Sequence, residues 1–243
     1  MRNIKLVLQY DGSRYHGWQR QPNGITIQQT LEAAISAVTG EEITLYGCGR
    51  TDAGVHAKGY VCNFFTASRF DASRFMYAIN SRLPDDIRCM SSCEVSADFD
   101  SRWATSKTYT YLIHNAPLPD VFLNKRAWHY RHELDIDAMK KAAESFLGEH
   151  DFIGFASSGF TVKTTVRTIY SLDVTQEGDV VRIDVCGNGF LYNMVRIIAG
   201  TLCFCGAGRI DWHDMPDIIA SCDRQRAGIT APADGLYLSE VVY

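Results

Sequence analysis

The chain has 243 residues, of which 46% are hydrophobic and 21% charged, and its formal net charge is −4 at pH 7. Its length suits one large domain or two smaller ones, and it lacks an apolar run of the ~20 residues that a membrane span requires. The acidic balance argues against an indiscriminate nucleic-acid binder. Because the first ten residues carry no small-residue cleavage site after an apolar core, we expect a cytoplasmic protein rather than a secreted one.

The charge is unevenly distributed along the chain. Residues 1–131 carry a net charge of +3, and residues 132–243 carry −7. A polyanionic partner would therefore be bound mainly by the first half, although a solvated basic face accounts for the asymmetry nearly as well.

Eight cysteines are present, but none of them forms a C-x-x-C pair. Cys203 and Cys205 lie in an apolar segment with no histidine nearby. We therefore predict buried free thiols, with neither a disulfide framework nor a structural metal.

The first predicted elements are a strand at residues 4–10, which alternates apolar and polar residues, and a helix that Thr26 caps and Gly40 ends. The loop between them, YDGSRYHGWQRQPNG, carries Arg14 and Arg20 among aromatic and amide side chains. Such a mixture could contact the phosphates and bases of a nucleic acid. It could equally be a long hairpin whose aromatic side chains pack inward.

A glycine-rich loop follows in the stretch LYGCGRTDAGVHAKGYVC at residues 45–62. Apolar runs on both sides predict a strand before and after it, at residues 43–48 and 59–65. Glycine lets a backbone approach a ligand closely, so the loop presents Arg50, Thr51 and Asp52 together as a cation, a hydroxyl and a carboxylate. An aspartate in such a loop is often only a turn former, so a catalytic interpretation needs partners elsewhere in the chain.

A second amphipathic segment begins at Asp71 and ends before Pro84. In the strand beyond it, Lys107, Tyr109 and Tyr111 share one face because side chains alternate along a strand. This face could stack a base, although tyrosines also favour strands for packing reasons alone. The strands predicted in this region cover residues 87–95 and 105–114.

The second half contains an apolar helix with one charge, Arg196, which either pairs with an anion or extends to the surface. The proline-containing segment at residues 115–120 is the best candidate for a domain boundary. We therefore predict an α+β protein with two subdomains, at residues 1–115 and 116–243. The elements predicted in the second are a helix at 135–147, a hairpin over 176–178, helices at 190–204 and 215–222, and a strand at 236–242.

Six stretches taken together resemble the tRNA pseudouridine synthase A family, whose members isomerise uridine in the anticodon arm of tRNA. They span almost the whole chain in order. They are YDGSRYHGWQRQ (10–21), GCGRTDAGVHA (47–57), NSRLPDDI (80–87), KTYTY (107–111), FLYNMVRIIAGTL (190–202) and APADGLYL (231–238).

The resemblance implies roles for individual residues of this chain. Asp52 falls on the nucleophilic aspartate, Tyr109 on the tyrosine that packs against the target base, and Arg196 on the arginine that pairs with the aspartate. Leu236 falls on a pocket leucine, and Arg50 on an arginine that positions the extruded nucleotide. Three further cations are candidates for substrate binding on residue chemistry alone, namely Arg14, Arg20 and Lys107.

The resemblance further implies the architecture and the substrate. Each subdomain would contain a mainly antiparallel sheet with helices on one face, and the active-site cleft would lie between the two. The enzyme would act as a homodimer on uridines at positions 38 to 40 of tRNA. The sequence has no dinucleotide or phosphate-loop motif and no cluster of His, Cys and Asp at metal-ligand spacing, so we expect neither a cofactor nor a metal. Two local departures stand out: Phe99-Asp100-Ser101-Arg102 replaces an expected Phe-His-Ala-Arg, and Gly154 replaces a serine that is usual after His150-Asp151-Phe152-Ile153.

The chemistry explains why a carboxylate is needed. Breaking the bond between ribose C1′ and uracil N1 leaves an electron-poor carbon, and an ionised carboxylate beside it can attack, stabilise charge or remove a sugar proton. The sequence leaves these three routes open. It also leaves two other functions open, a nucleoside N-glycosidase that releases uracil and an RNA-binding module without catalysis.

Overall fold

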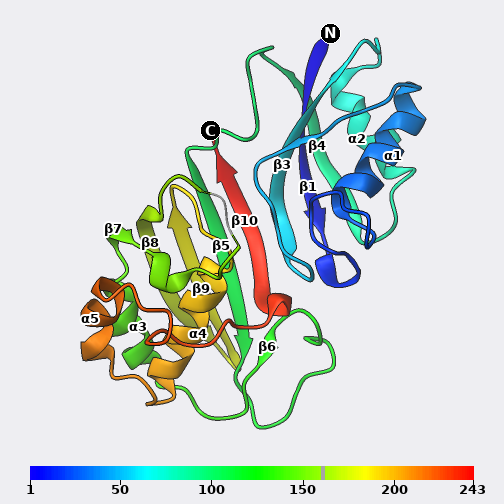
Figure 1. Cartoon of the computed structure of the whole chain (residues 1–243). Helices are drawn as coiled ribbons and strands as arrows, with labels where there is room; N and C mark the ends of the chain where they lie inside the picture. The colour runs from blue at the N-terminus through cyan, green and yellow to red at the C-terminus, as the bar shows by residue number, and fades with distance from the viewer. Residues whose placement is uncertain (160–161) are drawn as a thin grey trace. The chain divides into compact units, whose positions relative to one another are not determined.

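The computed structural model of the chain describes residues 1–159 and 162–243 (Figure 1). They form two compact units, Met1–Thr105 with Tyr237–Tyr243, and Ser106–Leu236. Both units combine a mainly antiparallel sheet with helices, which confirms the predicted α+β class. No helix in this part of the chain has both the length and the hydropathy that a membrane span requires.

The sheet of the first unit is built around β1 (Arg2–Tyr10), which lies between β3 (His56–Thr66) and β4 (Ile87–Val95) and is antiparallel to both. The last strand, β10 (Leu236–Val242), adds to β3 in parallel through Tyr237 opposite His56. The short β2 (Tyr46–Gly47) pairs with the other end of β3. The first and last strands of the chain thus belong to the same unit.

Two helices, α1 (Ile27–Thr39) and α2 (Phe75–Asn80), cover one face of this sheet (Figure 1). The predicted start and end of α1 are confirmed. The Oγ1 of Thr26 accepts a hydrogen bond from the Gln29 N–H, and Gly40 ends the helix with a φ of 73°. Short 3-10 turns precede Tyr15 and α2, at Gly12–Arg14 and Ala72–Arg74.

The core of the first unit lies between this sheet and its helices. Alternate residues of β1, namely Ile4, Leu6 and Leu8, are fully buried. On the helix side Leu31 and Phe75 are also fully buried. Each such side chain stabilises the fold by about 1.5–3 kcal/mol relative to an exposed one. The apolar residues at every second position of β1 and those on one side of α1 therefore point into the same core.

The sheet of the second unit contains four antiparallel strands in the order β5, β9, β8 and β7. A two-residue strand, β6, adds to β5 in parallel. The strands are β5 (Ser106–His114), β6 (Trp128–His129), β7 (Gly148–Asp151), β8 (Val166–Glu177) and β9 (Val180–Gly187). The predicted hairpin joins β8 to β9 through Gly178, whose φ is 55°.

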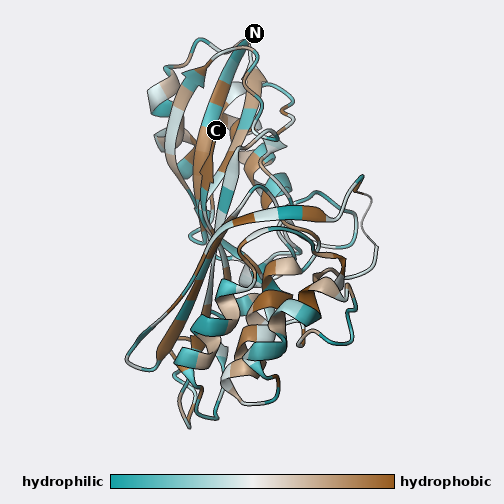
Figure 2. Ribbon diagram, turned by 90° about the vertical axis from the view of Figure 1, so that its left-hand side faces the viewer, coloured by the Kyte–Doolittle hydropathy of each residue, from teal (hydrophilic) through white to brown (hydrophobic). Residues whose placement is uncertain are grey.

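The helices of the second unit group together on one face of its sheet (Figure 2). They are α3 (Ile136–Glu144), α4 (Met194–Gly206) and α5 (Met215–Ala220). Every residue of α4 except Arg196 and Phe204 is buried, which confirms the predicted apolar helix. The unit also has 3-10 turns at Ile153–Phe155, Trp212–Asp214 and Ala233–Gly235.

Three predicted elements differ from the structure. The strand expected at 43–48 shrinks to two residues, because the Leu45 N–H bonds to the Glu32 side chain instead of to a strand. The helix expected to reach Leu147 ends at Glu144, since Gly148 begins β7, which had not been predicted. The apolar helix begins four residues late because Asn193 adopts a left-handed conformation with a φ of 61°.

The two units divide the chain differently from the subdomains predicted at 1–115 and 116–243. Strand β5 falls in the second unit because it pairs with β9 along its whole length. The last seven residues return to the first unit, where β10 pairs with β3. Strand pairing therefore sets the division, and the proline-containing segment lies inside the second unit.

All eight cysteines are free thiols, and five of them are buried. Burial raises the pKa of Cys62 well above its usual value, and it raises the pKa values of Cys89, Cys203 and Cys205 to about 12. Cys93 and Cys222 are exposed, and Cys186 is partly exposed.

We expect a disulfide reagent at pH 8 to modify two thiols of the native protein rapidly, those of Cys93 and Cys222. The buried thiols lack both access and thiolate character, so they should react only after unfolding. Counting modified sites by peptide mass spectrometry against time tests this, with Cys93→Ser losing one of the two fast sites. Rapid modification of Cys62 or Cys89 in the folded protein would contradict the core described above.

Candidate active site

The loop that carries Asp52 connects β2 to β3 and lies against the loop that follows β1. Two main-chain hydrogen bonds join them. The Trp18 N–H donates to the Thr51 carbonyl at 3.0 Å, and the Gly54 N–H donates to the Tyr15 carbonyl at 3.3 Å. Asp52 lies between these two bonds, so backbone groups hold the chain on both sides of its carboxylate.

The contact is so close that two glycines in the neighbouring loop are required. A Cβ on Gly17 would lie 2.3 Å from the Thr51 carbonyl oxygen, and one on Gly12 would lie 1.9 Å from that of Val55. Gly17 also has a φ of 79°, which other residues adopt only with strain. The glycines of YDGSRYHGWQRQ are thus explained by main-chain packing against the Asp52 loop.

Buried aromatic side chains also contact the loop that carries Asp52. The Tyr10 hydroxyl lies 2.9 Å from the Thr51 Oγ1, and the Tyr60 hydroxyl donates to the Gly49 carbonyl at 2.6 Å. The Trp18 ring stacks on the Tyr60 ring with centroids 4.0 Å apart. Burial raises the pKa of Tyr60 well above its usual value, so its phenol stays a neutral donor. Thr51 is buried, whereas Asp52 beside it is partly exposed.

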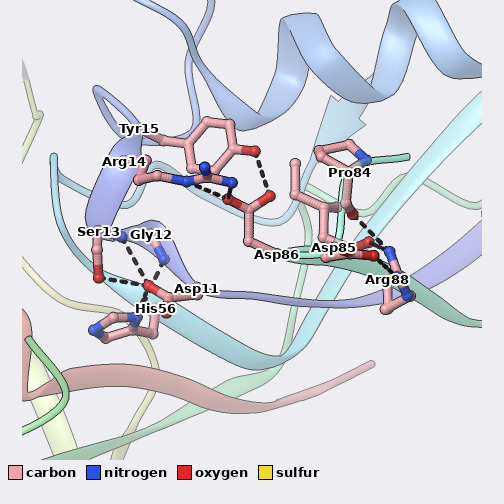
Figure 3. Close-up of polar contacts among 11 residues, drawn as sticks. Asp11, Gly12, Ser13, Arg14, Tyr15, His56, Pro84, Asp85, Asp86 and Arg88 are labelled. Carbon is pink, nitrogen blue, oxygen red and sulfur yellow. Dashed lines mark hydrogen bonds and ion pairs between the residues drawn. The ribbon is translucent and has the colours of Figure 1, made fainter. Parts of the chain in front are cut away.

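His56, just after the loop, is packed inside the first unit. Its ring is buried and stacks on Tyr237 with centroids 4.7 Å apart. Its Nδ1 lies 3.1 Å from the Gly12 N–H and 3.2 Å from Asp11 Oδ1 (Figure 3), and these contacts favour opposite protonation of that nitrogen. We assign Nδ1 as the acceptor, because Asp11 Oδ1 already accepts from the N–H and the hydroxyl of Ser13. These contacts hold the His56 ring in a fixed, buried position.

The cations predicted in the first unit differ in their surroundings. Arg14 is ion-paired with Asp86, and Arg20 with Glu32. Both arginine side chains remain largely exposed, at 73% and 58%. Arg50, two residues before the predicted nucleophile, is exposed. The carboxylates of Glu32 and Asp86 were not among the predicted site residues, although Asp86 belongs to the stretch NSRLPDDI.

In the second unit, Tyr109 lies on β5 and is partly exposed. Its ring meets Phe190 edge-on, with centroids 5.2 Å apart. Lys107, two residues earlier, is also partly exposed. Tyr111 is different, because it is fully buried and its hydroxyl donates to the Pro232 carbonyl at 2.7 Å. Of the two tyrosines on this face, Tyr111 therefore belongs to the core.

Arg196 is tied to main-chain and side-chain oxygens of its own unit. Its Nε donates to the Ala231 carbonyl and its Nη1 to the Asn193 Oδ1, both at 2.7 Å. The amide of Ala231 in turn donates to the Arg196 carbonyl at 3.1 Å. The same segment leads to Leu236, a buried residue that begins β10. Arg196 thus has a fixed guanidinium instead of one that simply extends into solvent.

Within each unit the predicted residues gather around one element. Asp52 and Arg50 share a loop in the first unit, with the loop of Arg14 packed against it. In the second unit, the helix that carries Arg196 and the 3-10 turn before Leu236 both contact β5, which carries Tyr109 and Lys107. Among the residues described, no group of three or more His, Cys, Asp or Glu side chains could hold a metal ion. The role of each residue remains a prediction.

The sequence matches that of known proteins over its whole length. The family described as tRNA pseudouridine synthase matches residues 6–103 and 142–243. A tRNA pseudouridine synthase A of Acetivibrio thermocellus is 52% identical over 244 residues, and one of Ruminiclostridium cellulolyticum is 49% identical over 245, with all of both chains covered in each case. A solved archaeal box H/ACA sRNP Nop10-Cbf5 complex matches with a TM-score of 0.41 and 12% identity, over 92% of this chain and 59% of that one.

The family match and the full-length relatives define the class of the protein as an RNA-modifying enzyme. The chain belongs to the tRNA pseudouridine synthase family. The resemblance predicted from the six sequence stretches is confirmed.

The packing of Gly17 against the Asp52 loop generates a test. We expect Gly17→Ala to lower the free energy of unfolding by roughly 2–5 kcal/mol, from left-handed strain plus the collision with Thr51. Gly40→Ala is the matched control, because Gly40 has a similar φ of 73° and a Cβ there would meet nothing within 4 Å. It should lose only about 1–2 kcal/mol. Urea unfolding of both variants measures the difference. Equal losses of unfolding free energy would show that the close contact with Thr51 does not constrain this position.

Proposed function

We propose that this protein isomerises uridine to pseudouridine in tRNA, at positions 38 to 40 of the anticodon stem-loop. The observation that carries the proposal is full-length similarity to tRNA pseudouridine synthases, with an aspartate on the fixed loop where the family's nucleophile is expected. Such an enzyme would work in the cytoplasm, where tRNA is its substrate.

The proposed reaction rearranges one nucleotide without net loss. The bond from ribose C1′ to N1 breaks, the uracil turns, and C1′ bonds to C5. The hydrogen on C5 leaves as a proton, and N1 ends with a proton, so atoms and charge balance without an oxidant. Asp52 supplies the carboxylate beside C1′, and attack, charge stabilisation and removal of a sugar proton all fit an ionised group there.

The target uridine must leave its stack before it can react. Extrusion costs a few kcal/mol, and stacking on an aromatic ring returns about 1–3 kcal/mol per base. We assign this stacking to Tyr109, whose ring orientation is supported by the edge-on contact with Phe190. The phenol of Tyr109 is also our candidate to take the C5 proton, and Leu236 our candidate for the apolar wall of the pocket.

We assign Arg196 the role of keeping the catalytic carboxylate ionised. Removing a carboxylate from water raises its pKa, and a nearby guanidinium opposes that rise. The bonds from Arg196 to Ala231 and Asn193 fix the direction of its guanidinium, which supports an electrostatic role that requires little reorganisation.

The remaining cations are proposed to bind the RNA. Arg50 positions the extruded nucleotide, and Arg14, Arg20 and Lys107 contact phosphates. The exposure of Arg14 and Arg20 supports this, because an ion-paired guanidinium that is more than half exposed still has N–H groups for a phosphate. A homodimer would double the basic surface of an acidic chain, and we propose that one tRNA contacts both subunits.

Tritium at C5 of uridine in tRNA separates this function from the other two. An isomerase releases the label into water, an N-glycosidase releases labelled free uracil, and a binding module releases neither. We expect label in water, and Asp52→Asn should slow its release by at least roughly 1000-fold, the scale of losing a nucleophile. Asp137→Asn is the control, because that carboxylate is exposed on α3. Normal release from the Asp52 variant would contradict the proposed function.

Substitution of Arg196 tests the electrostatic assignment separately. Arg196→Met should lower kcat by on the order of 100-fold, as the loss of one active-site electrostatic group does, and leave tRNA affinity nearly unchanged. Single-turnover kinetics and filter binding at one fixed salt concentration provide the two values. A loss of affinity equal to the loss of turnover would instead identify Arg196 as an RNA contact.

A further inference from the structure

We propose that Asp86 is a positioning residue for the catalytic loop, which it holds in place through the loop at residues 11–18 without touching the substrate. The inference rests on the proposed function, because it assigns to Asp86 an effect on turnover by Asp52.

Asp86 binds the loop at three separate points (Figure 3). One carboxylate oxygen accepts from the Tyr15 hydroxyl at 2.6 Å. The other accepts from the Arg14 Nε at 2.8 Å and also from its Nη2. The main-chain carbonyl of Asp86 accepts from the Asp11 N–H at 2.9 Å. One residue, just before β4, thus contacts the loop at Asp11, Arg14 and Tyr15.

The far side of that segment contacts the Asp52 loop. The carbonyl of Tyr15 accepts from the Gly54 N–H, so a single residue joins the Asp86 carboxylate to the chain two residues after Asp52. Gly12, next to Asp11, packs on the Val55 carbonyl. The contacts form a continuous path from Asp86 through Tyr15 to Gly54.

The contact between Asp86 and Tyr15 is largely shielded from solvent. The Asp86 side chain is only 12% exposed, and Tyr15 is 7% exposed. Burial and the bond to Asp86 raise the pKa of Tyr15 far above its usual value, so the phenol remains a donor throughout the physiological range. Removing the carboxylate would leave a buried hydroxyl without this acceptor, a cost that moving Tyr15 would relieve.

The neighbouring Asp85 is a natural comparison. Its side chain is fully exposed and pairs with Arg88, which also bonds to the Pro84 and Ile87 carbonyls of the same turn (Figure 3). Asp85 and Asp86 thus have the same chemistry and adjacent positions, but only Asp86 reaches the loop that contacts Gly54.

The experiment compares Asp86→Ala, Asp86→Asn and Tyr15→Phe with the control Asp85→Ala. We expect Asp86→Ala to lower kcat roughly 10- to 100-fold, since small misplacements of a catalytic group have effects of this size. Its tRNA affinity should change less than about threefold. Asp86→Asn, which keeps an acceptor for Tyr15, should recover part of kcat, and Asp85→Ala should match the unmodified protein.

Amide hydrogen exchange provides a readout that a merely local role of Asp86 would not change. Peptides covering residues 50–55 should exchange faster in Asp86→Ala and in Tyr15→Phe. Peptides from α1, in the same unit, should keep their normal rate and so report that this unit is still folded. Unchanged exchange at 50–55, or unchanged kcat despite faster exchange, would overturn the proposal. If the unmodified protein released no label from tritiated tRNA, the proposed function would fail, and the exchange data would still decide whether Asp86 holds the loop.

Discussion

The main-chain contact between the loop after β1 and the loop that carries Asp52 is the constraint on which the candidate site depends. It consists of two peptide hydrogen bonds and two approaches that only glycine permits. Peptide groups at van der Waals distance have almost no freedom to shift, so the loop backbone is defined to either side of the carboxylate. If Asp52 has the catalytic role proposed above, a carboxylate held in this way needs little reorganisation when the substrate arrives.

Two carboxylates of the first unit support the segments that make this contact. Asp86 holds Arg14 and Tyr15, and Glu32, nearly buried on α1, holds Arg20 and the Leu45 amide before the Asp52 loop. A buried carboxylate is tolerated when it is paired and hydrogen-bonded, as both of these are. In the second unit, Arg196 is held in a similar way by hydrogen bonds to oxygens of Ala231 and Asn193. Asn193 has a left-handed backbone conformation, which asparagine adopts more readily than most residues.

The departure from the family pattern at Phe99-Asp100-Ser101-Arg102 has a local explanation. Ser101 is buried, and its hydroxyl donates to the Tyr46 carbonyl at 2.5 Å, a bond that alanine could not make. Hydrogen bonds from Arg102 lower the pKa of Asp100, and the Arg102 guanidinium lies 5.1 Å from the centre of the Tyr46 ring. Ser101 directly, and Asp100 through Arg102, therefore contact Tyr46 of β2, the strand that leads into the Asp52 loop. Strand β2 remains paired with β3.

The sequence by itself determined the fold class, the ends of α1 and the bounds of β4 and β10, because caps and alternating apolar residues are local signals. It also indicated the loop of Asp52 and the residues of the family pattern. Only the tertiary structure showed that Gly12 and Gly17 are packing requirements, that Tyr111 is a core residue, and that Asp86 reaches Tyr15. These facts concern pairs of residues tens of positions apart, and nothing within a single stretch specifies which distant backbone or carboxylate will lie against it.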